Sequence, residues 1–269
     1  MDDLRLATWN VLHGRSLTHG QVVLDDLRAG AAALDADVVA LQEVDRHQPR
    51  SHDVDQVREV ADVLGARWFR FVPTLWGEPG VTWERARDGD EDAPSSARSA
   101  YGIGLVSRRP VLAWAVRRFP PARVGMPLLV PGRGITMVDD EPRVAVAALV
   151  DGPAGPLTVV ATHLSFVPGV NVRQLQTVTR WAEGYPRPRV LLGDLNLPGR
   201  LPSWVSGWRQ LGRVATYPSW RPLVQFDHAL AHGLGPQAEP QVTSRRLPVS
   251  DHRPLVVTLT TRMRPARRT

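Results

Sequence analysis

The sequence predicts an α/β domain built on mixed β-sheets rather than on one parallel sheet. Short apolar runs alternate with segments of helical spacing in the first part of the chain. Polar residues typical of active sites stand where four strand-like runs end, at Asn10, Glu43, His163 and Asp194, and where two begin, at Asp227 and Asp251/His252. If these residues share one edge, four strands leave that edge and two enter it, so a doubly wound parallel nucleotide-binding sheet is not expected.

Hydrophobic periodicity gives the expected order of elements. Alternating or short unbroken apolar runs predict strands, and apolar residues repeated every three or four positions predict helices. The expected strands lie at 4–10, 37–43, 68–72, 101–107, 111–116, 143–150, 157–162, 190–192, 225–230 and 255–259. The expected helices lie at 23–34, 54–64 and 172–182. Asp53 and Gln56 form an expected capping pair for the second helix.

Two long segments interrupt this order. Residues 73–100 and 119–142 are rich in proline and glycine, so both are expected to be loops. Between them, 101–107 and 111–116 are expected to pair as a hairpin. The two strands that follow the second loop are expected to form another hairpin.

Composition limits the domain organisation. The chain has 269 residues, of which 43% are hydrophobic, so it is long enough for one large core. We expect one domain at 1–261 and a basic tail at 262–269. The absence of cysteine excludes disulfides, thiolate metal sites and cysteine nucleophiles. No apolar stretch approaches the ~20 residues needed to span a bilayer, and the N-terminus does not resemble a signal peptide, so we expect a cytoplasmic protein, and a monomer.

The net charge of +6 comes largely from the tail, through Arg262, Arg264, Arg267 and Arg268. The rest of the chain therefore carries about +2, and every cation in it is an arginine. Arginine favours bidentate phosphate contacts, but a basic tail is typically a solvated chain end. Charge alone does not predict a nucleic-acid-binding protein.

The stretch 189–196 has the arrangement most typical of a site. Residues 190–192 form an apolar run that indicates a buried strand, and Gly193 allows the backbone to turn or to approach a ligand closely. Asp194 and Asn196, two positions apart, then project on the same side where the strand ends. The structural alternative is a turn containing aspartate that only terminates the strand.

Several common catalytic motifs are missing. Gly102 and Gly104 lack the third glycine of a dinucleotide fingerprint and open no helix. A Walker loop needs a lysine, and the sequence has none. There is no Gly-x-Ser-x-Gly elbow, and His163, His228 and His252 lack the spacing of a zinc protease. Oxygen ligands with few histidines suit Mg²⁺ or Mn²⁺ better than zinc.

Six short motifs occur in one order between residues 8 and 254. They are Thr8-Trp9-Asn10, Gln42-Glu43, Thr162-His163-Leu164, Gly193-Asp194-Leu195-Asn196, Asp227-His228 and Ser250-Asp251-His252-Arg253-Pro254. This set resembles that of the endonuclease/exonuclease/phosphatase superfamily, which includes DNase I-like nucleases, apurinic-site endonucleases, inositol polyphosphate 5-phosphatases and neutral sphingomyelinases. The resemblance implies a four-layer α/β sandwich, with two mixed β-sheets packed face to face and helices outside.

The resemblance also implies a metal-dependent phosphoesterase. Mg²⁺ or Mn²⁺ would be held by Glu43, with Asn10 and Asp251 nearby. A cation is needed there because the charge of a phosphoester repels an incoming hydroxide. Asp194 would orient or deprotonate the attacking water, and Asn196 would position that water or the phosphate.

Two histidines complete the implied site. His163 would donate a hydrogen bond to a phosphate oxygen, and His252 would face the phosphate while Asp227 holds its other ring nitrogen. Structural alternatives exist for each residue: Glu43 as a surface strand end, His163 as a hydrogen-bonded structural histidine, and Asp227 with His252 as a structural pair. His228 is expected to pack in the interior.

The substrate class stays open between nucleic acid and a small or lipid-linked phosphoester. Leu12 stands where the apurinic endonuclease subgroup has a carboxylate, so metal ligation depends on Glu43. The sequence also lacks the lysines and basic loops of a strong duplex binder. Five tryptophans are expected in loops that border the site, where they could stack on bases, touch lipid or plug the core edge; they are Trp76, Trp83, Trp204, Trp208 and Trp220.

A catalytically inactive sandwich domain used for binding is the alternative function. Such a module would be expected to lose one of the charged site residues. All five are present: Glu43, Asp194, Asp227, Asp251 and His252. The sequence therefore favours the enzyme.

Overall fold

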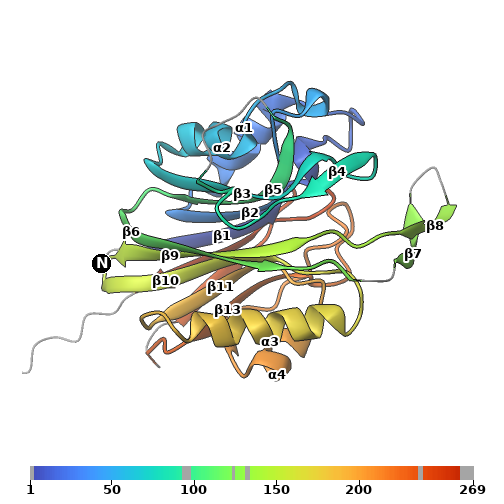
Figure 1. Ribbon diagram of the computed structural model, residues 1–269. Helices are drawn as coiled ribbons and strands as arrows, with labels where there is room; N and C mark the ends of the chain where they lie inside the picture. Colours follow the sequence, from blue (N-terminus) through green and yellow to red (C-terminus); the bar gives the residue numbers. More distant parts are fainter. Residues whose placement is uncertain (1–2, 93–97, 123–124, 131–133, 236–238, 261–269) are drawn as a thin grey trace, which may run out of the picture.

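Two β-sheets pack face to face in this protein, and helices cover their outer faces (Figure 1). The computed structural model describes residues 3–92, 98–122, 125–130, 134–235 and 239–260. The order of layers in Figure 1 is helices, sheet, sheet, helices. The predicted four-layer sandwich with mixed sheets is confirmed.

The first sheet has seven strands in the order β14-β15-β1-β2-β5-β3-β4. Its strands are β1 (Leu4–Asn10), β2 (Val38–Arg46), β3 (Trp68–Glu78), β4 (Thr82–Arg85), β5 (Ala100–Ser107), β14 (Glu239–Thr243) and β15 (Leu255–Thr260). β1 pairs in parallel with β2 and antiparallel with β15. The carboxyl ends of β1 and β2 therefore meet the amino end of β15 at one edge.

The second sheet has six strands in the order β12-β13-β11-β10-β9-β6. Its strands are β6 (Val111–Phe119), β9 (Arg143–Gly152), β10 (Gly155–His163), β11 (Arg189–Asp194), β12 (Arg209–Gln210) and β13 (Asp227–His232). β10 and β11 are parallel, with His163 opposite Asp194, and β13 runs antiparallel with Asp227 opposite Asp194. The sequence correctly predicted which strands leave this edge and which enter it.

Helices shield the two outer faces. They are α1 (Leu24–Leu34) and α2 (Gln56–Leu64) on the seven-stranded sheet, and α3 (Val170–Ala182) and α4 (Leu201–Ser206) on the other. The 3-10 turns Leu12–Gly14 and Pro49–Ser51 follow β1 and β2. Each longer helix, α1, α2 or α3, buries one apolar stripe, and the regular spacing of that stripe in the sequence predicts the helix. Among the described residues, no helix has the length and apolarity needed to cross a bilayer.

An apolar layer between the sheets fixes their positions. Alternate residues of the inner strands meet in it, for example Leu6 and Leu105 from one sheet and Val159 and Leu192 from the other, all inaccessible to solvent. Burial of such side chains contributes roughly 1.5–3 kcal/mol each. Residues at the rims of these strands are consequently held at defined positions.

The predicted hairpin between 101–107 and 111–116 is wrong. β5 pairs with β2 and β3 in the first sheet, whereas β6 pairs with β9 in the second. The connection between β5 and β6 therefore passes from one sheet to the other. Both strands have the same apolar character, so the pattern could not show which sheet each joins. The hairpin of β9 and β10 is confirmed.

Both predicted loops contain strands. In 73–100, β3 extends to Glu78 and pairs with β4, and Trp76 and Trp83 lie on these strands. In 119–142, β7 (Met126–Val130) and β8 (Gly134–Val138) form a separate hairpin that projects from the rest of the fold, at the right of Figure 1. Proline and glycine content favours loops but does not exclude short strands between the turns. The basic tail at 262–269 lies outside the described residues.

The predicted cap of α2 is also wrong. Asp55 is the N-cap, and its carboxylate accepts hydrogen bonds from the backbone N–H groups of Val57 and Arg58. Gln56 instead bridges two segments: its side chain accepts from Asp45 N at 2.9 Å and donates to the carbonyl of His13 at 2.7 Å. The capping residue lies two positions after the one predicted.

Candidate functional site

Asn10 joins the two sheets at the edge where the polar strand ends converge. Its amide Nδ2 donates to Glu43 Oε1 at 2.9 Å and to Asp194 Oδ2 at 3.2 Å. Its Oδ1 accepts from the backbone N–H of Leu12 at 3.1 Å, which fixes the orientation of the amide. Three of the predicted site residues are therefore brought into one group.

A β-bulge turns Glu43 out of its strand. The register of β2 against β5 shifts between Gln42 and Val44, and Glu43 has a positive φ of 56°. An extra residue of this kind bends the strand and re-aims a side chain. The Glu43 carboxylate consequently faces Asn10 and stays partly accessible to solvent.

Close packing places the Asp194 carboxylate. A Cβ on Gly193 would lie 2.1 Å from the carbonyl oxygen of Thr162 on the neighbouring strand, so only glycine fits there. Asn196 has a φ of 50°, and its backbone N–H donates to Asp194 Oδ1 at 3.0 Å. The strand therefore ends in a side-chain turn that both orients a buried carboxylate and presents Asn196.

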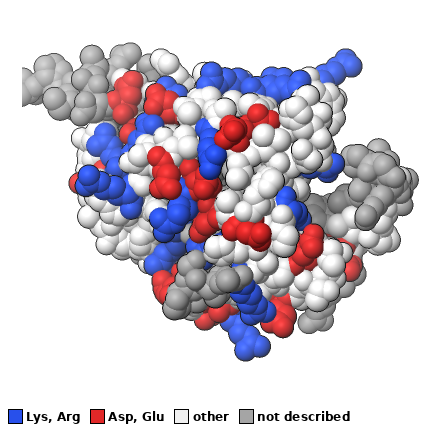
Figure 2. Space-filling view, turned by 90° about the horizontal axis from the view of Figure 1, so that it is seen from above, with Lys and Arg blue, Asp and Glu red and all other residues white. Residues whose placement is uncertain are grey.

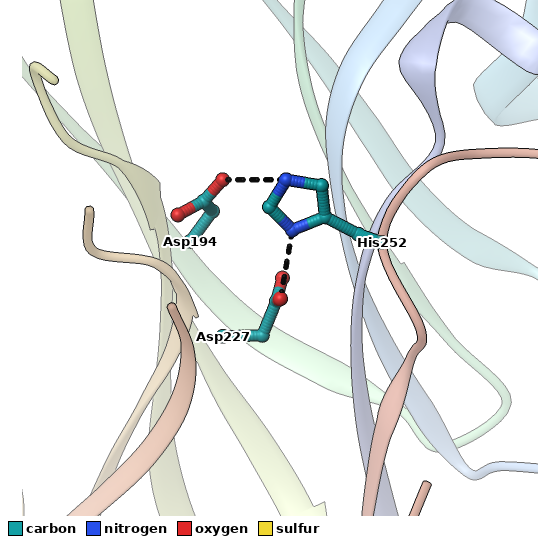
Figure 3. Close-up of side chains that lie close together, drawn as sticks. All are labelled: Asp194, Asp227 and His252. Atoms are coloured by element: carbon teal, nitrogen blue, oxygen red, sulfur yellow. Dashed lines mark hydrogen bonds and ion pairs between the residues drawn. The ribbon is translucent and has the colours of Figure 1, made fainter. Parts of the chain in front are cut away.

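Asp227 and His252 form a buried pair across the two sheets (Figure 3). His252 Nδ1 lies 2.8 Å from Asp227 Oδ2, and Nε2 on the other side of the ring lies 3.7 Å from Asp194 Oδ2. Burial alone would lower the pKa of His252, but the negative charges of Asp227 and Asp194 raise it to about 10. The imidazole is thus held as a cation between two carboxylates. These three residues form the buried Asp/Asp/His cluster of the site.

His163 lies on the other side of Asp194. Its Nε2 is 3.7 Å from Asp194 Oδ2 and 3.4 Å from Asn196 Nδ2, and its Nδ1 is 3.2 Å from Arg143. Burial lowers the pKa of His163 well below its usual value, and the charges of Arg143 and His252 add to this effect. The two site histidines therefore differ in charge.

The remaining part of the site is rich in acidic side chains whose ionised form is disfavoured by burial. Burial raises the pKa of Glu43 to about 7, and the charge of Asp251 adds to the rise. Burial likewise raises the pKa values of Asp194 and Asp251. Among the described residues, only the Asn10 amide donates a hydrogen bond to Glu43. A hard divalent cation bound by oxygen atoms would favour the ionised form of these carboxylates, so the residues present fit such an ion.

The sequence missed three residues around this group. Arg143 starts β9 and contacts His163. The ring of Tyr217 lies over His252, with 4.9 Å between ring centroids. The carboxylate of Glu141 adds negative charge near Glu43, and burial raises its own pKa. Each lies outside the six motifs; Glu141 and Arg143 stand at the end of the proline- and glycine-rich segment 119–142.

Other predicted residues lie away from the reacting group. His228 is fully buried and bonds through Nε2 to the carbonyl of Leu197 at 2.8 Å, as expected for packing. Trp208 is also buried, and Trp204 is exposed on α4. Of the five tryptophans, Trp208 and Trp220 lie in loops as predicted. The backbone N–H of Ser219, just before Trp220, donates to the carbonyl of Asp251, so the loop of Trp220 borders the site.

Comparisons with known proteins identify a matching family and similar folds. A family model described as "Endonuclease/Exonuclease/phosphatase family" matches residues 7–252, and no curated protein matches the chain. A solved endonuclease/exonuclease/phosphatase from Beutenbergia cavernae DSM 12333 is 25% identical, with a TM-score of 0.62 over 96% of this chain and 72% of that one.

Two further solved structures share the fold at lower identity. Mannosyl-6-phosphatase from Bacteroides thetaiotaomicron VPI-5482 is 12% identical, with a TM-score of 0.60, and the match covers 96% of this chain and 100% of that one. Humanized D. rerio TDP2 is 17% identical, with a TM-score of 0.57 over 96% of this chain and 99% of that one. These likenesses concern the fold alone.

The Asp227–His252 pair generates a prediction about ionisation. Because the Asp227 charge stabilises the imidazolium, Asp227→Asn should lower the pKa of His252 from about 10. Histidine NMR of the metal-free protein over a pH series measures this value. Asp62→Asn, which removes one negative charge from the exposed side of α2, is the control and should leave the pKa of His252 unchanged. An unchanged His252 pKa in Asp227→Asn would show that the contact does not hold the charge.

Proposed function

This chain belongs to the endonuclease/exonuclease/phosphatase family, and we propose that it hydrolyses a phosphoester by attack of water, with the help of a divalent cation. The observation that carries the proposal is a chain of contacts: the Asn10 amide bonds to both Glu43 and Asp194, and the Asp227–His252 pair adjoins Asp194. A purely structural network would not need three carboxylates next to a buried imidazolium, because burying charge costs free energy.

Mg²⁺ or Mn²⁺ is the proposed cofactor. Glu43 and Asn10 would hold the ion, together with Asp251, since all three offer hard oxygen ligands. The bound ion would supply positive charge against the phosphoryl oxygens and lower the barrier to attack. Leu12 supplies no ligand here, so Glu43 is the principal charged one.

The chain's own residues divide the remaining work. Asp194 would orient the attacking water and accept its proton, and the backbone N–H of Asn196 holds that carboxylate in position. The amide of Asn196 and the Nε2 of His163 would contact the phosphate. His252, kept cationic by Asp227, would stabilise the charge that develops on a phosphoryl oxygen.

The proposed substrate is a phosphoester of either nucleic acid or a small or lipid-linked compound. The fold neighbours include a protein named as a phosphatase. Figure 2 shows arginines and acidic side chains interspersed on the face covered by α1 and α2, and ion pairs such as Arg28–Glu59 account for part of this pattern. This one face therefore presents no continuous basic surface for duplex DNA. The monomeric state stays a prediction.

A binding module without activity is the alternative. It would keep the sandwich but would not need a precisely oriented carboxylate. At Asp194 a side-chain turn orients the carboxylate, and only glycine fits at the preceding position. The buried ionic pair would also be dispensable in such a module. These observations favour the enzyme.

A substrate screen with one matched variant tests the proposal. The screen covers plasmid DNA, single-stranded DNA, RNA, bis-p-nitrophenyl phosphate, inositol phosphates and sphingomyelin, with Mg²⁺ or Mn²⁺. On any substrate that turns over, Asp194→Asn should reduce kcat at least roughly 100-fold, because it removes the basic group while conserving volume. Asp62→Asn is the control. Near-normal turnover by a folded Asp194→Asn protein would return this residue to a structural role.

Glu43→Gln tests the cation site. A neutral amide is a poorer ligand for a hard cation, so the variant should need a higher Mg²⁺ concentration for half-maximal rate. Excess EDTA should abolish hydrolysis by the native protein, and added Mg²⁺ should restore it. The cation hypothesis is contradicted by full hydrolysis in EDTA after metal removal, and an unchanged Mg²⁺ titration in Glu43→Gln would exclude Glu43 as a ligand.

A further inference from the structure

The ring of His163 lies between two hydrogen-bond donors. Arg143 approaches Nδ1, with 3.2 Å between its terminal nitrogen and the ring. The Asn196 amide approaches Nε2 at 3.4 Å. The same amide nitrogen donates to the carbonyl of Leu164 at 3.0 Å, which identifies it as the NH₂ group rather than the oxygen.

Only one of these two contacts can be a hydrogen bond to the ring. A neutral imidazole has one nitrogen that accepts and one that carries hydrogen, and a guanidinium has no acceptor at all. If Nδ1 accepts from Arg143, the ring hydrogen is on Nε2, and Asn196 cannot donate to it. If Nε2 accepts from Asn196, the ring hydrogen points at the Arg143 cation.

Three observations favour the contact with Arg143. It is the shorter of the two, and its donor is charged, which makes such bonds stronger. Asp194 Oδ2 lies 3.7 Å from Nε2, so a hydrogen on Nε2 points toward an acceptor. The low pKa of His163 agrees with a neutral ring.

Arg143 is itself held in place. Its side chain is only 5% exposed, and it contacts Asp140 at 3.4 Å and Glu141 at 4.0 Å. The guanidinium carbon Cζ of Arg143 also lies 5.9 Å from the centre of the Phe166 ring. Because the segment before β9 supplies Asp140 and Glu141 and the segment after β10 supplies Phe166, the guanidinium cannot easily turn away from His163.

We propose that Arg143 is a positioning residue that locks His163 as the neutral tautomer with its hydrogen on Nε2. The proposal rests on the proposed function, in which Nε2 faces a phosphoryl oxygen. While Arg143 is in place, Nδ1 cannot take up a hydrogen, so His163 offers the phosphate a hydrogen bond but no second ring hydrogen. The site then has one neutral imidazole donor at His163 and one imidazolium at His252.

The protein contains a matched control pair. Arg189 contacts Nδ1 of His232, also at 3.2 Å. Arg189 lies at the start of β11, at the opposite end of that strand from Asp194. Arg189 is 6% exposed, so both arginines are buried. A general effect of removing a buried arginine from this sheet should therefore appear in Arg189 variants as well.

Nitrogen-15 NMR of histidine-labelled protein tests the lock without measuring activity. In the native chain, Nδ1 of His163 should show the shift of an unprotonated nitrogen and Nε2 that of a protonated one. The signal is assigned by its loss in His163→Gln. The opposite tautomer, or a doubly protonated ring, overturns the proposal even if every variant fails to fold.

Activity and tautomer are then compared in variants. Arg143→Met should give a mixture of tautomers and lower kcat roughly 10-fold to 100-fold with a smaller change in KM. Arg143→Lys, which keeps a charged donor, should restore the native tautomer and part of the rate. Arg189→Met should lower thermal stability but leave the nitrogen-15 shifts of His163 and kcat unchanged.

The outcomes separate this proposal from the proposed function. An unchanged His163 tautomer in Arg143→Met contradicts the lock, whatever happens to the rate. An equal loss of kcat in Arg189→Met would make the effect one of general stability and would also overturn it. If no phosphoester is hydrolysed by the native chain, the proposed function fails, while the NMR result still decides the tautomer.

Discussion

The site exists because hydrogen bonds join two separate sheets. Asn10 from β1 bonds to Asp194 from β11, and His252, just before β15, bonds to Asp227 at the start of β13. Neither sheet alone brings these groups together. The apolar layer between the sheets fixes their distance, so packing in the interior determines the geometry at the edge. Close packing around Gly193 transmits that constraint to the carboxylate itself.

Burial and charge oppose each other at this edge. The pKa values of Glu43, Asp194 and Asp251 are all raised, with burial as the largest cause, although Glu43 and Asp251 keep partial access to solvent. The imidazolium of His252 offsets part of this negative charge, and Asn10 supplies hydrogen bonds. A protein tolerates such a cluster at a cost in stability, and the proposed binding of a cation and a phosphoester would account for that cost.

Local patterns predicted most of what determines the site. Buried runs that stop at polar residues gave the directions of the six strands and therefore the mixed sheets, and the ordered motifs gave the four-layer arrangement. The sequence did not reveal which sheet β6 joins, because apolar alternation does not encode the partner strand. It also missed Arg143 and Tyr217, since their importance arises from contacts with His163 and His252 that are distant in sequence.

The central claim is that residues from both sheets act as one catalytic unit, and a double-mutant cycle on Asp227 and His252 tests it most directly. Turnover of one diester is measured for Asp227→Asn, His252→Ala and the double variant. If Asp227 acts by orienting and charging His252, the double variant should be about as slow as His252→Ala alone. Losses that multiply would mean that the two residues act independently, and the account of the site would be wrong.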